Sequence, residues 1–442
     1  MSTKTFFGHP SGLATLFFTE MWERFSYYGM RALLILFMTT PAISGGLEFD
    51  DITAGAIYGL YTMGVYLFAL PGGWLADHLI GLKKSVWYGG IIIAMGHFTM
   101  ALPGIAGLVG LDQAEGVSGL DIYSFYLGLV LIVIGTGMLK PNVSSIVGEL
   151  YGGAEDKDSA KRDAGFSIFY MGINIGALLA PLVTSFLAAE VDWHIGFGAA
   201  GIGMVLGLIQ YRATASSLDG YGDAPVYESP EEYAKAAKTA GIAKIAGGIL
   251  LVVFGLFFFR VISIDAISIA NASKYIIASV AVLFFAYIFL FGGLTSEEKG
   301  KVGVIGLLLL FSALFWSGFE QAGSTLNLFA ERFTDRTVLG WEIPAGMFQS
   351  INSMFIIIFA PIFGAMWVWL AKRHLEPSSP LKFAFGLILL GMGFLVMYFA
   401  AKIAASGDLA APTWLIFTYL LHTFGELSLS PVGLSLVTKL SP

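Results

Sequence analysis

Long apolar runs, separated by short polar breaks, extend from one end of the chain to the other. Most runs reach about 20 residues, the length that an α-helix needs to cross a bilayer. They lack strand alternation, and the strands of a membrane barrel would be about half as long. The pattern therefore predicts an all-α polytopic membrane protein. We expect twelve helices, over residues 13–38, 52–76, 85–108, 122–148, 164–189, 195–211, 241–262, 273–294, 303–328, 345–371, 382–404 and 412–438.

Composition supports this interpretation. Of the 442 residues, 56% are hydrophobic and 12% are charged, whereas a soluble domain has about 25% charged residues. The chain has no Cys, which excludes disulfides and thiolate metal sites. Its His residues are scattered without ligand spacing, so we expect no metal centre. We expect no nucleic-acid partner either; the lipid bilayer is the predicted surrounding.

Basic residues set the predicted orientation. We number the connections between the twelve predicted helices in chain order. The odd-numbered connections hold five Lys and Arg residues, and the even-numbered connections together with the two chain ends hold sixteen. The remaining three of the 24 lie inside helices. Because cytoplasmic loops carry the excess of Lys and Arg, the N-terminus is predicted to be cytoplasmic.

A long polar connection, residues 213–240, divides the chain. Within it Ser229-Pro230-Glu231-Glu232 is a capping box with Pro at N1, which predicts a short amphipathic cytoplasmic helix. We expect a six-helix bundle over 1–212, an inserted helix pair over 241–300, and a second bundle of four helices over 301–442. A two-half transporter would have six helices there, so we expect that the protein continues for two more.

Seven acidic or basic residues lie well inside the predicted helices, away from the helix ends. A charge at a helix centre costs roughly 2.5–3.5 kcal/mol in a bilayer, and it usually marks a pathway. In the first helix, positions 20, 23, 24, 27 and 31 share one face, which predicts a polar cavity beside it. The seven residues are Glu20, Glu23, Arg24, Arg31, Lys140, Glu320 and Glu426.

Depth along the helices suggests how these charges pair. Glu20 and Glu23 are level with Lys140, and Arg31 is level with Glu320 nearer the outside, at about 1.5 Å per residue. One interpretation is that the ions only pin helices together. The favoured interpretation is a central cavity whose pairs are made and broken, so that proton binding to a carboxylate shifts a conformational balance.

The connection between the second and third helices has a candidate latch. Gly72 to Asp77 is followed by Gly81, Lys83 and Lys84. Close glycine packing with a charged latch at a helix end can hold one face shut. The plainer interpretation is an ordinary positively charged cytoplasmic loop.

Several motifs resemble one transporter family. Glu20 to Gly29 resembles the ExxERFxYYG signature of the proton-dependent oligopeptide transporter family, within the major facilitator superfamily. The segment Gly72–Lys84 resembles the superfamily loop signature. Four further segments resemble motifs of family helices 4, 5, 7 and 10: Gly135–Asn142, Phe169–Ala177, Phe315–Gln321 and Gly425–Pro431. The family fold has six plus six helices, with an extra pair between the halves in bacterial members. Ser353 follows Asn352 where many members have Pro.

The resemblance implies roles for particular residues. Proton coupling would use Glu20, Glu23, Arg24, Lys140 and Glu320. The peptide carboxylate would be attracted by Arg24 and Lys140, and the peptide ammonium would be held by Glu426. The peptide site as a whole would comprise Arg24, Tyr27, Tyr28, Arg31, Tyr66, Lys140, Asn174, Trp316, Asn352 and Glu426. The gates would comprise Asp77, Lys83, Lys84, Arg31 and Glu320.

The resulting hypothesis is a proton-coupled symporter that imports di- and tripeptides across a bacterial inner membrane by alternating access. We expect it to need no cofactor beyond the proton gradient and to function as a monomer. A carrier of nitrate, amino acids or drugs on the same scaffold is the main alternative. A membrane enzyme or receptor is disfavoured, since the sequence offers no nucleophile, metal set or signalling domain.

Overall fold

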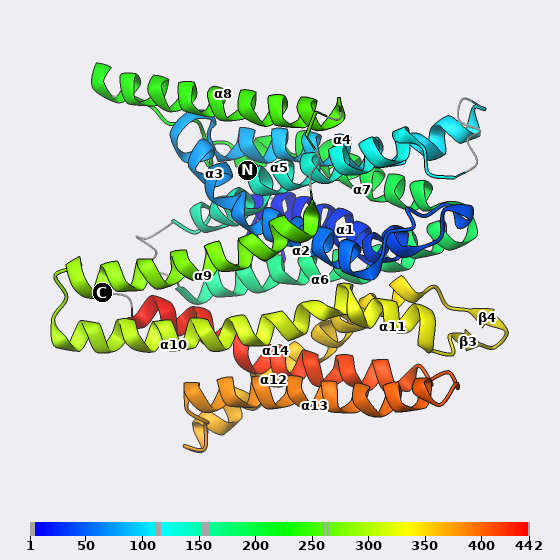
Figure 1. Cartoon of the computed structure of the whole chain (residues 1–442). Helices are drawn as coiled ribbons and strands as arrows, with labels where there is room; N and C mark the ends of the chain where they lie inside the picture. Colours follow the sequence, from blue (N-terminus) through cyan, green and yellow to red (C-terminus); the bar gives the residue numbers. More distant parts are fainter. Residues whose placement is uncertain are drawn as a thin grey trace. The chain divides into compact units, whose positions relative to one another are not determined.

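The computed structural model describes residues 5–110, 116–152, 159–227, 229–259, 261–262 and 265–440, with only the backbone for 159–160 and 431–440. Almost all of the described chain is helical (Figure 1). It divides into two compact units, Met1–Ile269 and Ala270–Pro442. The prediction of an all-α polytopic chain is confirmed, since ten of the described helices are long and apolar enough to cross a membrane.

The first unit contains eight main helices. They are α1 (Gly12–Thr39), α2 (Asp51–Leu67), α3 (Ala69–Leu75), α4 (Leu82–Leu108), α5 (Gly119–Glu149), α6 (Ser159–Glu190), α7 (Trp193–Ala213) and α8 (Pro230–Phe258). Shorter elements are the hairpin β1 (Thr5–Phe6) and β2 (His9–Pro10), the 3₁₀ turns η1 (Ala42–Ser44) and η4 (Ala215–Leu218), and the π-helical turn η2 (Ala76–Ile80).

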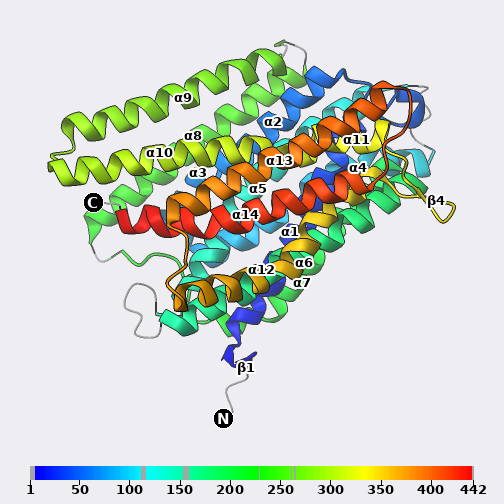
Figure 2. The same ribbon diagram turned by 90° about the horizontal axis from the view of Figure 1, so that it is seen from below.

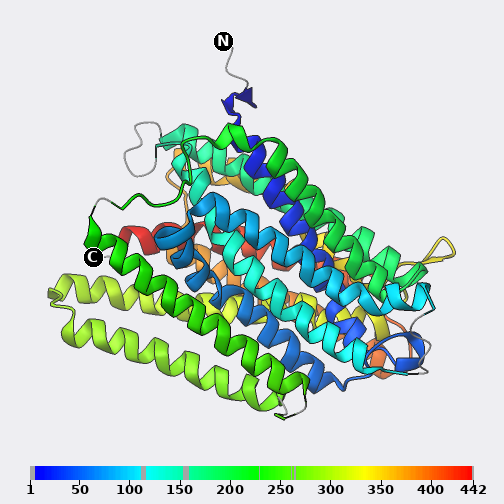
Figure 3. The same ribbon diagram turned by 90° about the horizontal axis from the view of Figure 1, so that it is seen from above.

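Helix α1 packs along α6 and α7, and α4 packs along α5 and α7. Figure 3 shows the dark-blue α1 running beside the green α7. Glycines set the approach of α4 to α5: a Cβ on Gly89 would lie 2.7 Å from the carbonyl oxygen of Gly135, and one on Gly128 would lie 2.8 Å from that of Gly96. Small residues at such crossings let two membrane helices approach closely.

The second unit contains the remaining helices and one hairpin. They are α9 (Ala266–Phe291), α10 (Ser296–Phe319), the 3₁₀ turn η5 (Glu320–Gly323), α11 (Thr325–Phe333), β3 (Thr337–Val338), β4 (Trp341–Glu342), the 3₁₀ turn η6 (Ala345–Gln349), α12 (Ser350–Lys372), α13 (Ser379–Ala405) and α14 (Thr413–Leu440). Figure 2 shows the orange α13 beside the red α14, and their packing is the most extensive in this unit. α14 also packs on α10 and α12.

The helix predicted over 52–76 is interrupted. α2 ends at Leu67, α3 begins at Ala69, and η2 continues the path to Ile80. Pro71 has no N–H to donate to the carbonyl of Leu67, so one hydrogen bond of the regular ladder is missing beside this interruption. The result is a bent path that ends at Gly81, which has a φ of +81°.

The short cytoplasmic helix predicted after Ser229 is wrong as a separate element. The Ser229 side chain does accept a hydrogen bond from Glu232 N at 3.2 Å, and Pro230 does occupy N1. The helix then continues without a break into the predicted membrane segment and ends at Phe258. Ala and Lys dominate the intervening residues, and both favour helix.

Candidate functional site

Three charges of α1 form one buried cluster. Arg24 Nε lies 2.8 Å from Glu20 Oε1 and 3.0 Å from Glu23 Oε2. Glu20, Glu23 and Arg24 are only 2%, 1% and 5% exposed. Within the described residues, Glu20 Oε2 and Glu23 Oε1 accept no hydrogen bond. A buried pair of carboxylates that shares one guanidinium therefore keeps oxygens available to accept a proton.

The polar face of α1 continues beyond this cluster to Arg31, as the helical repeat predicts. Arg31 Nε donates to the hydroxyl of Tyr58 on α2 at 2.7 Å, and its guanidinium lies 5.8 Å from the centre of the Tyr28 ring. Tyr27 stacks on Tyr61 of α2, with ring centres 6.4 Å apart. Sequence reasoning missed Tyr58 and Tyr61. Their three-residue spacing on α2 is the signal that could have placed them opposite α1.

Lys140 of α5 lies beside an aromatic ring. Its Nζ is 4.2 Å from the centre of the Tyr66 ring on α2, a cation–π distance. Its charge also acts on the carboxylate of Glu23. The ion pairs given above join both carboxylates to Arg24, and the predicted pairing of Glu20 or Glu23 with Lys140 stays a prediction. The structure thus brings Glu23, Arg24, Lys140 and Tyr66 into one region of the first unit.

Helix α6 packs closely against α1 at Gly176. A Cβ on Gly176 would collide with the backbone oxygen of Met21 and would lie 3.0 Å from Arg24 Cβ. Asn174, two residues earlier, is 4% exposed, and its amide donates to the Tyr170 carbonyl of its own helix at 3.0 Å. Its predicted role toward a peptide remains a prediction.

The second unit holds a separate polar cluster. The Asn352 amide of α12 donates to Glu426 Oε2 at 3.2 Å and to Thr423 Oγ1 at 2.9 Å, both on α14. Glu426 is 8% exposed, and the charge of Glu320 lies close enough to act on it. The structure therefore brings Glu320, Asn352 and Glu426 together. Thr423 was not predicted, although it lies one turn before Glu426.

A helix break positions Glu320. The helix predicted over 303–328 ends as α10 at Phe319, and Glu320 starts the 3₁₀ turn that leads into α11. Trp316, in the last turn of α10, packs edge-on against Phe319 with ring centres 5.1 Å apart. Regular α-helix stops at Phe319 and resumes at Thr325, and this interval contains Gly323 and Ser324, which disfavour a continuous helix. Transporters place such discontinuous helices at their binding sites.

The structure locates the residues of the candidate latch, whose gating role stays a prediction. Asp77 and Lys84 are exposed, and neither pairs with a charged side chain among the described residues. Lys83 Nζ instead lies 2.6 Å from Asp223 Oδ1, in the segment that follows α7. Gly72 does pack tightly, since a Cβ there would collide with the carbonyl of Gly137 on α5.

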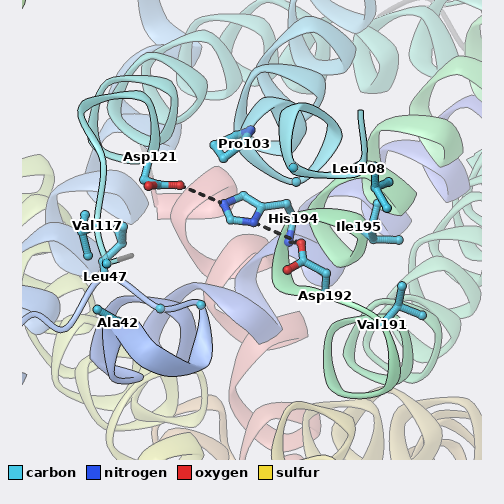
Figure 4. Close-up of a pocket in the computed structure, with 15 residues that line it drawn as sticks. Ala42, Leu47, Pro103, Leu108, Val117, Asp121, Val191, Asp192, His194 and Ile195 are labelled. Atoms are coloured by element: carbon cyan, nitrogen blue, oxygen red, sulfur yellow. Dashed lines mark hydrogen bonds and ion pairs between the residues drawn. The ribbon is translucent and has the colours of Figure 1, made fainter. Parts of the chain in front are cut away.

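A cavity of about 390 Å³ lies at one end of the first unit, away from the α1 cluster. Figure 4 shows His194 between two carboxylates there. Its Nδ1 lies 3.1 Å from Asp192 Oδ1, and its Nε2 lies 3.7 Å from Asp121 Oδ1. Burial by itself would raise the pKa of Asp192. Hydrogen bonds from His194 and the attraction of its ring outweigh this effect, and the pKa lies below the ordinary value of 3.8.

Both acids of this cavity also cap helices. Asp192 accepts from the amide of His194 at 2.8 Å, at the start of α7, and Asp121 completes the capping box of α5 with Ser118. In the described chain no group of three or more His, Asp or Glu is arranged to hold a metal ion. Through His194 the cluster links the start of α7 to the start of α5.

Comparison with known proteins identifies the family. The sequence profile of the POT family matches residues 83–442. The chain belongs to the POT family. Its relatives include the peptide transporter YePEPT of Yersinia enterocolitica, which is 42% identical over 99% of this chain and 83% of that protein. A di-/tripeptide transporter of Lactococcus lactis is 35% identical over 99% of this chain and 85% of its own length.

Solved structures agree with this POT assignment. A crystal structure of peptide transporter POT in complex with sulfate superposes with a TM-score of 0.85 and 40% identity, covering 100% of this chain and 84% of that one. The resemblance inferred from the motifs is confirmed, and so is the transporter fold of the major facilitator superfamily. As a POT protein, the chain is a multi-pass membrane transporter.

Proposed function

We propose that this protein is a proton-coupled symporter that imports di- and tripeptides by alternating access. The observation that carries the proposal is the buried cluster in which Arg24 binds both Glu20 and Glu23. Protonation of a carboxylate would weaken its hold on Arg24, which would free the guanidinium to bind an anionic group. A proton and a peptide carboxylate would then stabilise the same state, as coupling requires.

The two units carry side chains of opposite charge, and these are suited to the two oppositely charged ends of a peptide. In the first unit, Arg24 and Lys140 are cations suited to a carboxylate. In the second, Glu426 is an anion suited to an ammonium, oriented by Asn352. Tyr27, Tyr28, Tyr66 and Trp316 would contact side chains, and Asn174 would contribute a hydrogen bond. Recognition of the termini would tolerate many peptide side chains.

Several finer assignments belong to the same proposal. Arg31 and Glu320 would act as an outer gate, and Asp77, Lys83 and Lys84 would act at the cytoplasmic side. The protein would lie in a bacterial inner membrane with its N-terminus in the cytoplasm, in keeping with its basic residues. It would work as a monomer without a cofactor.

Uptake by proteoliposomes tests the proposal. Dialanine should accumulate when an inward proton gradient is imposed, and collapse of the gradient with an ionophore should abolish accumulation. Nitrate, single amino acids and drugs at the same concentration should compete poorly. Gradient-independent dialanine uptake, or accumulation of one of the competitors in place of dialanine, would refute the proposal.

A further inference from the structure

The segment Ala215–Tyr227, which follows α7, forms a strap over one end of the first unit. Leu218 anchors it: this side chain is fully buried in the core cluster that also contains Leu82 and Val147. Ser217 adds a hydrogen bond of 2.7 Å between its hydroxyl and that of Thr15 on α1. The strap is therefore packed onto the bundle by both apolar and polar contacts.

The strap holds the first turn of α4 by its backbone. The amide of Lys83 donates to the Gly222 carbonyl at 2.9 Å, and Lys83 Nζ donates to the Leu218 carbonyl at 3.2 Å. Gly81 permits this contact, since a Cβ there would lie 2.6 Å from the amide nitrogen of Ala224. A side chain at position 81 would push the strap away.

The same strap reaches two other elements. The Gly222 amide donates to Glu149 Oε2, at the end of α5, at 2.6 Å. The Tyr227 hydroxyl donates to the carbonyl of His78 in η2 at 2.7 Å. The strap thus joins the end of η2, the start of α4 and the end of α5, at the point where the chain between α3 and α4 consists of a π-helical turn and Gly81.

The ion pair of Lys83 with Asp223 completes this arrangement. The two charged atoms are 2.6 Å apart, and the Lys83 and Asp223 side chains are 23% and 63% exposed. Such an exposed pair stabilises little on its own. Here Gly222, beside Asp223, is held by two backbone hydrogen bonds and the Lys83 ammonium is held by the Leu218 carbonyl, so less conformational entropy is lost when the pair forms.

We propose that Asp223 is a positioning residue, which fixes Lys83 and the loop Gly81–Lys84 so that η2, α4 and α5 move as one body during transport. This inference rests on the transport cycle proposed above. π-Helical turns often mark functional sites, and Gly81 adds a second flexible point. Alternating access is largely rigid-body rocking, so a strap across this joint adds to the packing of α3 and α4 on α5 in carrying motion through the joint.

Neutralising Asp223 tests the role of the charge. In Asp223→Asn, the maximal rate of dialanine uptake should fall about two- to fivefold, the effect of losing one exposed ion pair, while the Kd for dialanine stays unchanged. The double variant Lys83→Asp with Asp223→Lys should recover the rate. Asp219→Asn is the matched control, because Asp219 lies in the strap and its carboxylate has no partner among the described residues.

Three results would overturn the inference. They are a normal uptake rate in Asp223→Asn, a parallel loss of dialanine affinity, and a failure of the charge exchange to restore uptake. Hydrogen exchange gives a readout that does not depend on transport. The amides of His78–Lys84 should exchange faster in Asp223→Asn than in Asp219→Asn. If wild-type protein showed no proton-driven uptake, the proposed function would fail, while the exchange data would still decide whether Asp223 holds the loop.

A reversible crosslink tests whether the strap stays docked. The chain has no Cys, so Lys83→Cys with Asp223→Cys provides two unique thiols. With both thiols reduced, the uptake rate should fall as in Asp223→Asn. Bridging them with a short bifunctional methanethiosulfonate should restore it, because the strap and loop are again held together. If bridging blocked uptake, the strap would have to release during the cycle and the inference would be wrong.

Discussion

Arg24 donates from Nε to Glu20 Oε1 at 2.8 Å across one turn of α1, with 6% and 2% of the two side chains exposed. In a bilayer, charges at this depth are tolerated mainly because they are paired. Removal of Arg24 would leave Glu20 and Glu23 buried without this ion-pair partner, which is costly, and protonation of Glu20 would leave Arg24 to Glu23 alone. The cluster is therefore a point where a single proton changes the pairing of a buried charge.

Replacing Glu20 should uncouple the proton from transport. Glu20→Gln keeps the shape of the side chain but can neither be charged nor take up a proton. Proton-driven accumulation of dialanine in proteoliposomes should fall to background, while counterflow of dialanine at equal pH persists in part. Glu190→Gln, an exposed site at the end of α6, is the control. Undiminished proton-driven uptake in Glu20→Gln would remove this residue from the coupling mechanism.

Glu426 should discriminate peptides by their amino terminus. Glu426→Gln should weaken binding of dialanine by roughly 10- to 150-fold, as expected for the loss of a charge-assisted hydrogen bond of about 1.5–3 kcal/mol. N-acetyl-dialanine, which has no ammonium, should bind both proteins similarly. Isothermal titration with the two ligands measures both effects. An equal loss for the two ligands would contradict a contact between Glu426 and the ammonium.

The ring of Tyr66 should matter to Lys140 more than its hydroxyl. Tyr66→Leu removes a cation–π contact worth about 0.5–2 kcal/mol and should weaken dialanine binding about 2- to 30-fold. Tyr66→Phe retains the ring and should lie close to wild type. Equilibrium binding of dialanine to wild type, Tyr66→Leu and Tyr66→Phe measures both effects. Equal affinities of the Leu and Phe variants would show that the contact does not orient Lys140.

Acid should loosen the start of α7. Because the folded-state pKa of Asp192 is lowered, its charge stabilises the fold above the ordinary value of 3.8, and this contribution is lost as the pH falls below that value. Asp192→Asn keeps a good helix cap but loses the attraction to His194. Its thermal unfolding midpoint should lie below that of wild type at pH 7, and the difference should be smaller at pH 3.

Asp192→Ala is the companion variant for this measurement. It also loses the cap, so its midpoint should stay below that of wild type at both pH values. A constant difference between wild type and Asp192→Asn from pH 7 to pH 3 would show that the carboxylate charge contributes nothing at this helix end.

The hydrophobic pattern and the charged residues predicted most helix positions and the polar face of α1. Helix positions follow from run length, because a backbone in lipid must satisfy its own hydrogen bonds. The charged face of α1 follows from helical spacing, and Glu20 and Arg24 at i and i+4 pair as that spacing allows. The break at Phe319 was missed, since an apolar run continues through it and periodicity does not register a single 3₁₀ turn.

The sequence alone determined the helical membrane architecture, the family and the identity of the intramembrane charges, because these depend on local composition and spacing. Only the tertiary structure decided which side chains these charges contact. It paired both Glu20 and Glu23 with Arg24, placed Lys140 over Tyr66, and joined Lys83 to Asp223. Pairing between distant segments depends on which backbones approach closely, and that is set by glycine contacts and by the packing of whole helices.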